Sequence, residues 1–333
     1  MQVFITGGSG YIGRSTIQAL IRHGIEVMAL TRSEHSARTV SDLGATAVVG
    51  ALTDTDVLRE AARQADGVIH LGVDYAEGTA DVDRGAAEAM QDGAGSRPYV
   101  HTGGVWVYGD TDGVVDEDAP LSPPRITAWR LENEKRVLAR AVTGERPVVV
   151  MPGLVYGRSG GLVQSFFVEP GRAAGAVPCI GDGSNHWALV HVDDIAALYV
   201  LALNAPAGSV YAGVSGQNLP LAVVTRALSH AAGCPGSLDS LTLEEAVQRM
   251  GPIAEAFALD QQFTGARAHR ELGWTPTRLD ALAELGPGLN RPPRPRSSLV
   301  RHALLGRLSC RINNPAGRYI RSASCAGCRS GAS

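Results

Sequence analysis

The feature that most constrains this fold is a glycine-rich turn that follows the first apolar run of the chain. Residues 3–5 (VFI) lead directly into residues 6–13 (TGGSGYIG), behind which a helical pattern begins. In such a turn Gly7 lets the strand turn tightly, Gly10 lets backbone N–H groups approach phosphates, and Gly13 lets the helix pack close to the strand. The phosphates then lie at a helix N-terminus. A glycine-rich string alone also suits an ordinary loop, but its place between a strand and a helix predicts a dinucleotide site.

Strands and helices alternate along the first half of the chain. Segments typical of strands are residues 3–5, 25–30, 45–49, 67–71, 97–101 and 147–151, and helical patterns fall at 15–23, 36–43, 57–63 and 129–141. Alternation with short connections predicts a parallel sheet that is covered by helices on both faces. The expected fold class is therefore α/β, a doubly wound parallel sheet of the Rossmann type, with a smaller C-terminal substrate portion.

Glycine and proline become frequent from residue 152 onward, which marks a change in organisation. Residues 191–201 predict a buried helix for which Asp193 is a plausible N-cap, and Gly273 is expected to end another helix. These signals divide the chain into a dinucleotide-binding domain, a substrate portion and a poorly ordered basic tail. The expected bounds are residues 1–151 plus about 188–205 for the first, 152–187 and 206–288 for the second, and 289–333 for the tail.

Charge is distributed unevenly between the body and the tail. Residues 291–333 hold nine arginines and no acidic residue, so the rest of the chain is acidic although the formal net charge is only −3. The tail is interpreted either as an extension that touches an acidic partner or as a terminus without function. Nucleic-acid binding is not expected, because an acidic body repels phosphates. Cys325 and Cys328 have the spacing of half a zinc site, but without a second pair no metal site is expected.

The chain carries no sign of a membrane or secretory protein. No apolar run reaches the roughly 20 residues that a membrane span needs, and no signal-peptide pattern is present. Cys179 and Cys234 stand alone, which suits a reducing compartment. We therefore expect a cytoplasmic protein.

Several short motifs in a fixed order resemble the extended short-chain dehydrogenase/reductase superfamily, which includes nucleotide-sugar epimerases and dehydratases. The resemblance spans about residues 1–280. It is carried by residues 6–13, 70–72 (HLG), 107–109 (VYG), 152–157 (PGLVYG) and 191–194 (HVDD). It implies a nicotinamide cofactor on the N-terminal sheet and a small-molecule substrate beneath the C-terminal portion. Helices around Glu88 and Trp129 are where dimers of this family commonly meet, so a homodimer is allowed for.

The end of the second strand indicates which nicotinamide cofactor is used. Relatives that prefer NAD place an acidic side chain there for the ribose hydroxyls, whereas a 2′-phosphate needs a cation. Here Arg32 stands between two hydroxyl side chains, so NADP(H) is expected rather than NAD(H). Many relatives carry an aspartate after the glycine of the third strand, where this chain has Ala51, so Leu52 or Asp54 is expected to line the adenine side. The residues expected to bind the cofactor are Thr6, Gly7, Gly10, Tyr11, Ile12, Gly13, Thr31, Arg32, Ser33, Leu52, Leu71 and Gly72.

The usual catalytic pair of the superfamily is missing. It consists of a tyrosine that acts as general acid/base and a lysine four residues later that lowers the pKa of the phenol. The chain has a single lysine, Lys135, and Leu131 stands four residues before it. Aligning the helix on Glu134 instead puts Ile126 and Arg130 at the two positions. The hydroxyl residue that orients the substrate is replaced by Gly104, counting back from the VYG motif.

Several residues are candidates to replace the missing groups. Thr102 is the nearest hydroxyl, Tyr108 is a candidate proton donor, and Arg130 can keep the electrostatic role of the lysine but cannot donate a proton. Solvated or packed positions are the plain alternatives for each of them. The remaining titratable candidates are Tyr156, His101, His186 and His191, and Trp106 and Trp129 are expected either to form an apolar wall of the site or to fill core.

Together these observations predict an atypical member of the superfamily that binds NADP(H). We expect a reductase, dehydrogenase or epimerase that acts on a small carbonyl or hydroxyl substrate through a non-standard active site. The alternative is a non-catalytic sensor that binds NADP(H) and reports redox state through a partner, which the missing pair favours and the retained substrate portion opposes.

Overall fold

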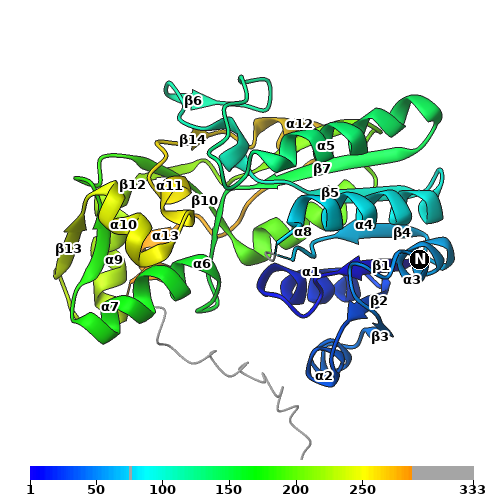
Figure 1. Cartoon of the computed structure of the whole chain (residues 1–333), viewed down its shortest axis with the longest axis horizontal. Helices are drawn as coiled ribbons and strands as arrows, with labels where there is room; N and C mark the ends of the chain where they lie inside the picture. The colour runs from blue at the N-terminus through cyan, green and yellow to red at the C-terminus, as the bar shows by residue number, and fades with distance from the viewer. Residues whose placement is uncertain (75–76, 287–333) are drawn as a thin grey trace, which may run out of the picture. The chain divides into compact units, whose positions relative to one another are not determined.

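Seven parallel strands form the central sheet of this computed structural model, which describes residues 1–74 and 77–286 (Figure 1). The strands are β1 (Gln2–Thr6), β2 (Glu26–Thr31), β3 (Thr46–Val49), β4 (Gly67–His70), β5 (Pro98–Thr102), β7 (Arg146–Pro152) and β11 (Ser209–Gly213). Their order is β11-β7-β5-β4-β1-β2-β3, and every neighbouring pair is parallel. The expected doubly wound α/β fold is confirmed.

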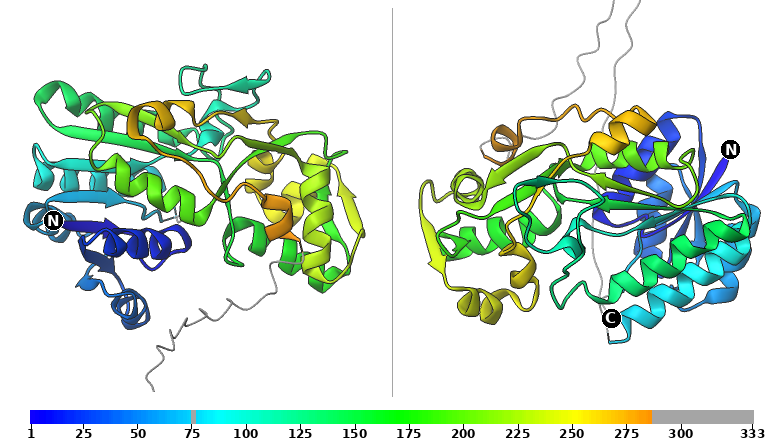
Figure 2. Two further views of the ribbon diagram at one scale, coloured as in Figure 1. Left: turned by 180° about the vertical axis from the view of Figure 1, so that it is seen from behind. Right: turned by 90° about the horizontal axis from the view of Figure 1, so that it is seen from above.

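Helices cover both faces of this sheet (Figure 2). Val3 and Ile5 of β1 share a core with α1 and α8, whereas Phe4, which points the other way, shares a core with α3, α4 and α5. Opposite faces of one strand are therefore both buried, which explains why the strand is apolar without alternation. The helices are α1 (Tyr11–Arg22), α2 (Glu34–Asp42), α3 (Thr55–Gln64), α4 (Thr79–Ala94), α5 (Trp129–Ala139) and α8 (Val192–Ala202).

The smaller portion is built mainly from the residues after β7. Its core gathers around Phe167, Trp187 and Phe257, which pack ring against ring. Its strands are β8 (Leu154–Tyr156), β9 (Val177–Ile180), β10 (His186–His191), β12 (Gln217–Pro220) and β13 (Leu238–Leu241), and β6 (Val114–Val115) pairs with β14 (Gln262–Phe263). Its helices are α6 (Gly161–Val163), α7 (Glu169–Ala174), α9 (Leu221–Ala232), α10 (Leu243–Met250), α11 (Ile253–Phe257) and α13 (Ala281–Leu285). Helix α12 (Ala266–Leu272) instead packs against β11 and α8 of the central-sheet layer. Three further short helices are the 3₁₀ helices η1 (Val105–Tyr108) and η2 (Arg140–Thr143) and the π-helix η3 (Gln164–Val168).

Two sequence expectations about this region need correction. Ser209–Gly213 belongs to the central sheet as β11 and not to the substrate portion, because helix α8 is the crossover that returns the chain parallel to β7. The N-cap of α8 is His191 and not Asp193, since the imidazole Nδ1 of His191 accepts a hydrogen bond from the Asp193 backbone N–H at 3.1 Å. Gly273 ends α12 as expected.

The tail and its cysteines, with residues 289–333, lie outside the described residues. Within the described part of the chain, no helix is both long enough and apolar enough to cross a membrane.

Candidate functional site

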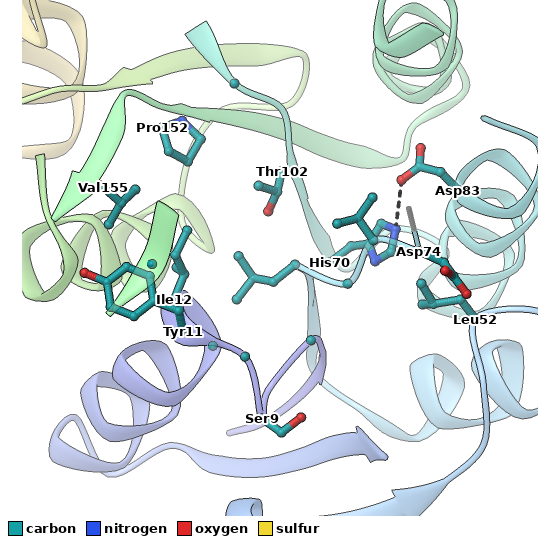
Figure 3. Close-up of a pocket in the computed structure, with 18 of the residues that line it drawn as sticks. Ser9, Tyr11, Ile12, Leu52, His70, Asp74, Asp83, Thr102, Pro152 and Val155 are labelled. Atoms are coloured by element: carbon teal, nitrogen blue, oxygen red, sulfur yellow. Dashed lines mark ion pairs between the residues drawn. The ribbon is translucent and has the colours of Figure 1, made fainter. Parts of the chain in front are cut away.

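One large pocket opens at the carboxyl ends of β1 and β4, the neighbouring strands at which the strand order changes direction. Figure 3 shows residues that line it. Its volume is about 1100 Å³. Crevices at this switch point of the strand order are where doubly wound sheets bind ligands. The pocket runs from the glycine-rich turn past the ends of β4 and β5 to η3 and α11 of the smaller portion.

The glycine-rich turn has the close approaches that the sequence predicts. Gly7 has a φ of +69°, and a β-carbon there would lie 2.7 Å from the Gly72 backbone nitrogen. A β-carbon on Gly13 would lie only 2.1 Å from the Gly7 carbonyl oxygen. No described side chain caps α1 at Gly10, so the unpaired N–H groups of its first turn are available to a ligand. This cradle fits a diphosphate.

A buried polar cluster, which the sequence analysis missed, joins the end of β4 to the turn. The Thr6 hydroxyl accepts a hydrogen bond from the Gly72 N–H at 3.0 Å and lies 2.6 Å from Nδ1 of His70. The other ring nitrogen of His70 lies 3.4 Å from Asp83, as Figure 3 shows, and the Asn133 amide donates to the same carboxylate at 2.9 Å. Burial raises the pKa of Asp83, but the nearby imidazoles of His70 and His101 and the hydrogen bond from Asn133 outweigh it and hold that pKa well below its usual range. The cluster therefore fixes the β4 end against the glycine-rich turn.

The residues expected on the adenosine side lie together at one end of the pocket. Arg32 lines it with 77% of its side chain exposed, 3.9 Å from the Asp74 carboxylate. Ser33 is the N-cap of α2, and its hydroxyl accepts from the Ser36 N–H at 3.2 Å. The Thr31 hydroxyl lines the pocket but donates to the Val48 carbonyl at 3.3 Å, so it is committed to the sheet.

The two residues expected on the adenine side after the third strand, Leu52 and Asp54, differ in their positions. Leu52 lines the pocket, while the Asp54 carboxylate turns back to accept a hydrogen bond from the Ala51 N–H at 2.8 Å. Leu71, Gly72, Tyr11 and Ile12 also line the pocket. Tyr11 in addition ties the turn to the smaller portion, because its hydroxyl donates to the Gly157 carbonyl at 2.6 Å.

Thr102 and Arg130, two of the three catalytic candidates, meet at the pocket wall. Arg130 donates to the Thr102 carbonyl at 3.1 Å, and its guanidinium lies 4.5 Å from the centre of the Trp129 ring. The Thr102 hydroxyl accepts a hydrogen bond from Tyr199 at 3.0 Å. Tyr199 was missed by the sequence analysis. Its one available signal is that it is the only side chain with a polar tip in the apolar run 195–202 of α8.

Tyr108, the third candidate, does not reach the pocket. The η1 turn directs it into the core, where its ring packs 5.0 Å from Phe263 and its hydroxyl donates to the Glu117 carbonyl at 3.1 Å. Burial raises its pKa further. The prediction that Tyr108 donates a proton to the substrate is therefore not supported by its position.

None of the other four titratable candidates is among the residues that line the pocket, and each contacts a different hydrogen-bond partner. Burial also lowers the pKa of His101 to about 3. Their partners are Arg278 for Tyr156 (2.8 Å), Tyr99 for His101 (3.1 Å), Asp260 for His186 (2.8 Å) and Glu284 for His191 (2.9 Å).

A buried carboxyl lies behind the wall formed by Gly103. Glu134 is 4% exposed, and its Oε1 has no hydrogen-bond partner among the described residues. A β-carbon on Gly103 would lie 2.7 Å from that oxygen. Burial raises the pKa of Glu134 to about 7 against the opposing effect of Arg130, one helical turn earlier. No group of three or more His, Cys, Asp or Glu side chains in the described residues is arranged to hold a metal ion.

Comparison with known proteins gives one family and relatives that cover most of the chain. The model of the NAD dependent epimerase/dehydratase family matches residues 3–212. The uncharacterized protein YLL056C of Saccharomyces cerevisiae is 30% identical over 301 residues, which cover 86% of this chain and 98% of that protein. The 4-hydroxy-2-methyl-3-oxo-4-farnesyl-3,4-dihydroquinoline-1-oxide ketoreductase of Stigmatella aurantiaca is 27% identical, with coverages of 86% and 97%. The crystal structure of the dTDP-glucose 4,6-dehydratase DesIV of Streptomyces venezuelae shares the fold, with a TM-score of 0.71 at 23% identity over 86% and 95% of the two chains.

Proposed function

Because the chain belongs to the NAD dependent epimerase/dehydratase family, we propose that it is a reductase that uses NADPH to reduce the carbonyl group of a small molecule. One observation carries the proposal: a single pocket joins the glycine-rich turn and Arg32 to Thr102 and Arg130. The ketoreductase from Stigmatella aurantiaca, similar over most of its length, supports a carbonyl substrate. The dinucleotide-binding part comprises the two segments expected from the sequence together with β11.

The choice of NADP(H) rests on the charge at the end of β2. A guanidinium forms paired, charge-assisted hydrogen bonds with a phosphate, whereas a carboxylate in this place would repel it. Arg32 is exposed in the pocket and Ser33 supplies a hydroxyl next to it. Asp74 lies 3.9 Å from Arg32, and a bound 2′-phosphate competes with that carboxylate for the guanidinium. We expect Arg32 to decide the preference for NADP(H) over NAD(H), because it is a cation with which a 2′-phosphate can pair at this end of the pocket.

The groups around the carbonyl follow from the contacts at the end of β5. When bound, NADPH supplies a hydride. A carbonyl group bound beside it would take this hydride at carbon and a proton at oxygen to give an alcohol. Arg130 stabilises the negative charge that develops on the oxygen but cannot deliver the proton. Since Tyr199 donates to Thr102, the hydroxyl proton of Thr102 is free to point into the pocket towards the carbonyl oxygen, and water supplies the replacement proton.

Titration calorimetry with NADPH and NADH tests the cofactor assignment. The wild-type chain is expected to bind NADPH more tightly, and Arg32→Ala is expected to lose at least tenfold in affinity for NADPH with little change for NADH. Arg38→Ala is a matched control, because Arg38 is equally exposed and pairs with Glu34 on the same helix. Equal affinities for the two nucleotides, or a preference that survives Arg32→Ala, would refute the assignment.

A second candidate is a non-catalytic NADP(H) sensor, which is favoured by one observation. Ile126 and Gly104 line the pocket at the positions where the family resemblance leads one to expect the tyrosine and the hydroxyl residue. Oxidation of NADPH in the presence of a panel of aldehydes and ketones distinguishes the two. Tight NADPH binding without turnover of any carbonyl compound would support the sensor.

A further inference from the structure

The end of the pocket away from Arg32 is walled by apolar side chains. Six of them come from η1, the turn before α5 and its first residue, the α6–η3 segment and α11. Each is only partly buried, so part of its apolar surface stays open to a ligand. Covering such surface is favourable for an apolar group and gains little for a sugar. The six are Trp106, Ile126, Trp129, Leu162, Phe166 and Ile253.

Charge is nearly absent from this end. Of the charged residues that line the pocket, Arg32 and Asp74 pair with each other on the adenosine side, and Asp83 accepts a hydrogen bond from Asn133 beside His70. The guanidinium of Arg130 already stacks on Trp129 and donates to the Thr102 carbonyl. A diphosphate or a carboxylate buried here would leave negative charge without adequate partners, which is costly. The ligand of this end is therefore uncharged.

Two of the three aromatic side chains in this wall are held in place by a buried aromatic ring. Phe257 is fully buried, and its ring centre lies 5.7 Å from that of Trp106 and 5.6 Å from that of Phe166. The Trp106 contact is edge-to-face at 89°. Rings fixed in this way present preformed surfaces on which another aromatic ring stacks or meets an edge without loss of side-chain freedom.

From this lining we infer that the substrate is an uncharged aryl ketone, with its ring against Trp106 and Phe166 and its carbonyl oxygen towards Thr102 and Arg130. The inference rests on the proposed function, because it concerns the same pocket. The ketone gains a hydride at carbon and, through the Thr102 hydroxyl, a proton from water at oxygen and becomes a secondary alcohol, while NADPH is oxidised to NADP⁺. A nucleotide sugar, with its charged diphosphate, is excluded from this end.

The test measures binding to the full chain saturated with NADP⁺, which separates recognition from turnover. Titration calorimetry with propiophenone is expected to show binding, and titration with UDP-glucose is expected to show none. Phe166→Asp and Ile253→Asp, which each put a carboxylate on the apolar wall, are each expected to weaken propiophenone binding at least tenfold. Leu243→Asp makes the same kind of change at an exposed leucine outside the pocket lining and is expected to alter binding less than twofold.

The affinity for NADP⁺, measured first for every variant, reports whether the cofactor end is intact. Unchanged NADP⁺ binding together with loss of propiophenone in both wall variants supports the inference. Tighter binding of UDP-glucose than of propiophenone, or propiophenone affinity that survives both substitutions, overturns it. Failure of the wild-type chain to bind NADP⁺ overturns instead the proposed function on which the inference rests.

Discussion

Replacing Glu134 by glutamine is expected to remove a pH dependence from the stability of the fold. The carboxyl is buried behind Gly103, and its pKa is raised by burial from an ordinary 4.5 to about 7. A raised pKa means that folding favours the neutral acid. The stability that this protonation contributes is therefore fully present below the unfolded pKa and is lost as the pH rises through the folded pKa.

The magnitude follows from the two pKa values. At about 1.4 kcal/mol per pKa unit, a shift from 4.5 to about 7 changes the free energy of unfolding by about 3.5 kcal/mol in full. About 2.5 kcal/mol of this change falls between about pH 5 and about pH 8, so through this one carboxyl the protein is less stable by that amount at the alkaline end. Glutamine keeps the shape and cannot ionise, so the variant lacks this contribution. Its free energy of unfolding is expected to exceed that of the wild type at the alkaline end.

Urea denaturation of both proteins across this pH range measures the difference directly. Subtracting the two curves cancels the other titrating groups, including the histidines. Glu132→Gln on the same helix is the control, because Glu132 is 62% exposed and pairs only with Arg136 at the surface. Curves for wild type and Glu134→Gln that run parallel with pH would show that the buried carboxyl does not titrate as argued.

Three further outcomes are expected from the site. Gly13→Ala puts a β-carbon 2.1 Å from the Gly7 oxygen and should weaken NADPH binding at least tenfold, as measured by fluorescence titration. Gly85→Ala is the control, because its β-carbon meets nothing within 4 Å, and equal effects of the two substitutions would contradict the argument from close approach. Thr102→Val should lower kcat by about 100-fold with little change in KM, and Thr102→Ser should restore most of it, whereas an active valine variant would rule out the hydroxyl. Tyr199→Phe removes the bond that orients Thr102 and should lower kcat by about tenfold; a loss as large as that of the valine variant would mean that Tyr199 does more than position it.

The sheet was predictable because its signal is local. Each central strand before residue 153 is a short apolar run followed by a turn, so its bounds could be predicted to within a residue or two. The position of the glycine-rich turn at the end of β1 could be predicted because the motif directly follows the first apolar run. Strand β11 was assigned to the wrong portion because nothing in residues 209–213 tells a central strand from a strand of a small sheet. That distinction depends on the crossover made by α8, which is a tertiary fact.

The site was predictable where the backbone defines it and unpredictable where side chains meet across the chain. Arg32 follows β2 directly, so its place in the pocket follows from the strand. The direction of Tyr108 depends on a short turn between Gly104 and Gly109, and sequence does not specify how such a turn rotates. The hydrogen bond between Tyr199 and Thr102 joins residues that are 97 positions apart, so no local sequence pattern predicts it.

The replacements at the two family positions change the chemistry in a consistent direction. Under the proposed function, and with the helix aligned on Glu134, Ile126 stands in place of the phenol and Arg130 keeps a permanent positive charge. The site then keeps a group that stabilises an oxyanion and lacks the phenolic acid of the family. Such a site suits hydride addition to a ketone, because the proton arrives after charge has developed on oxygen and can come from water. It suits removal of a hydride from an alcohol poorly, because that direction needs a base to take the hydroxyl proton first. The same isoleucine is one of the six apolar side chains that line the substrate end, so the absence of the phenol adds to the apolar character of that end.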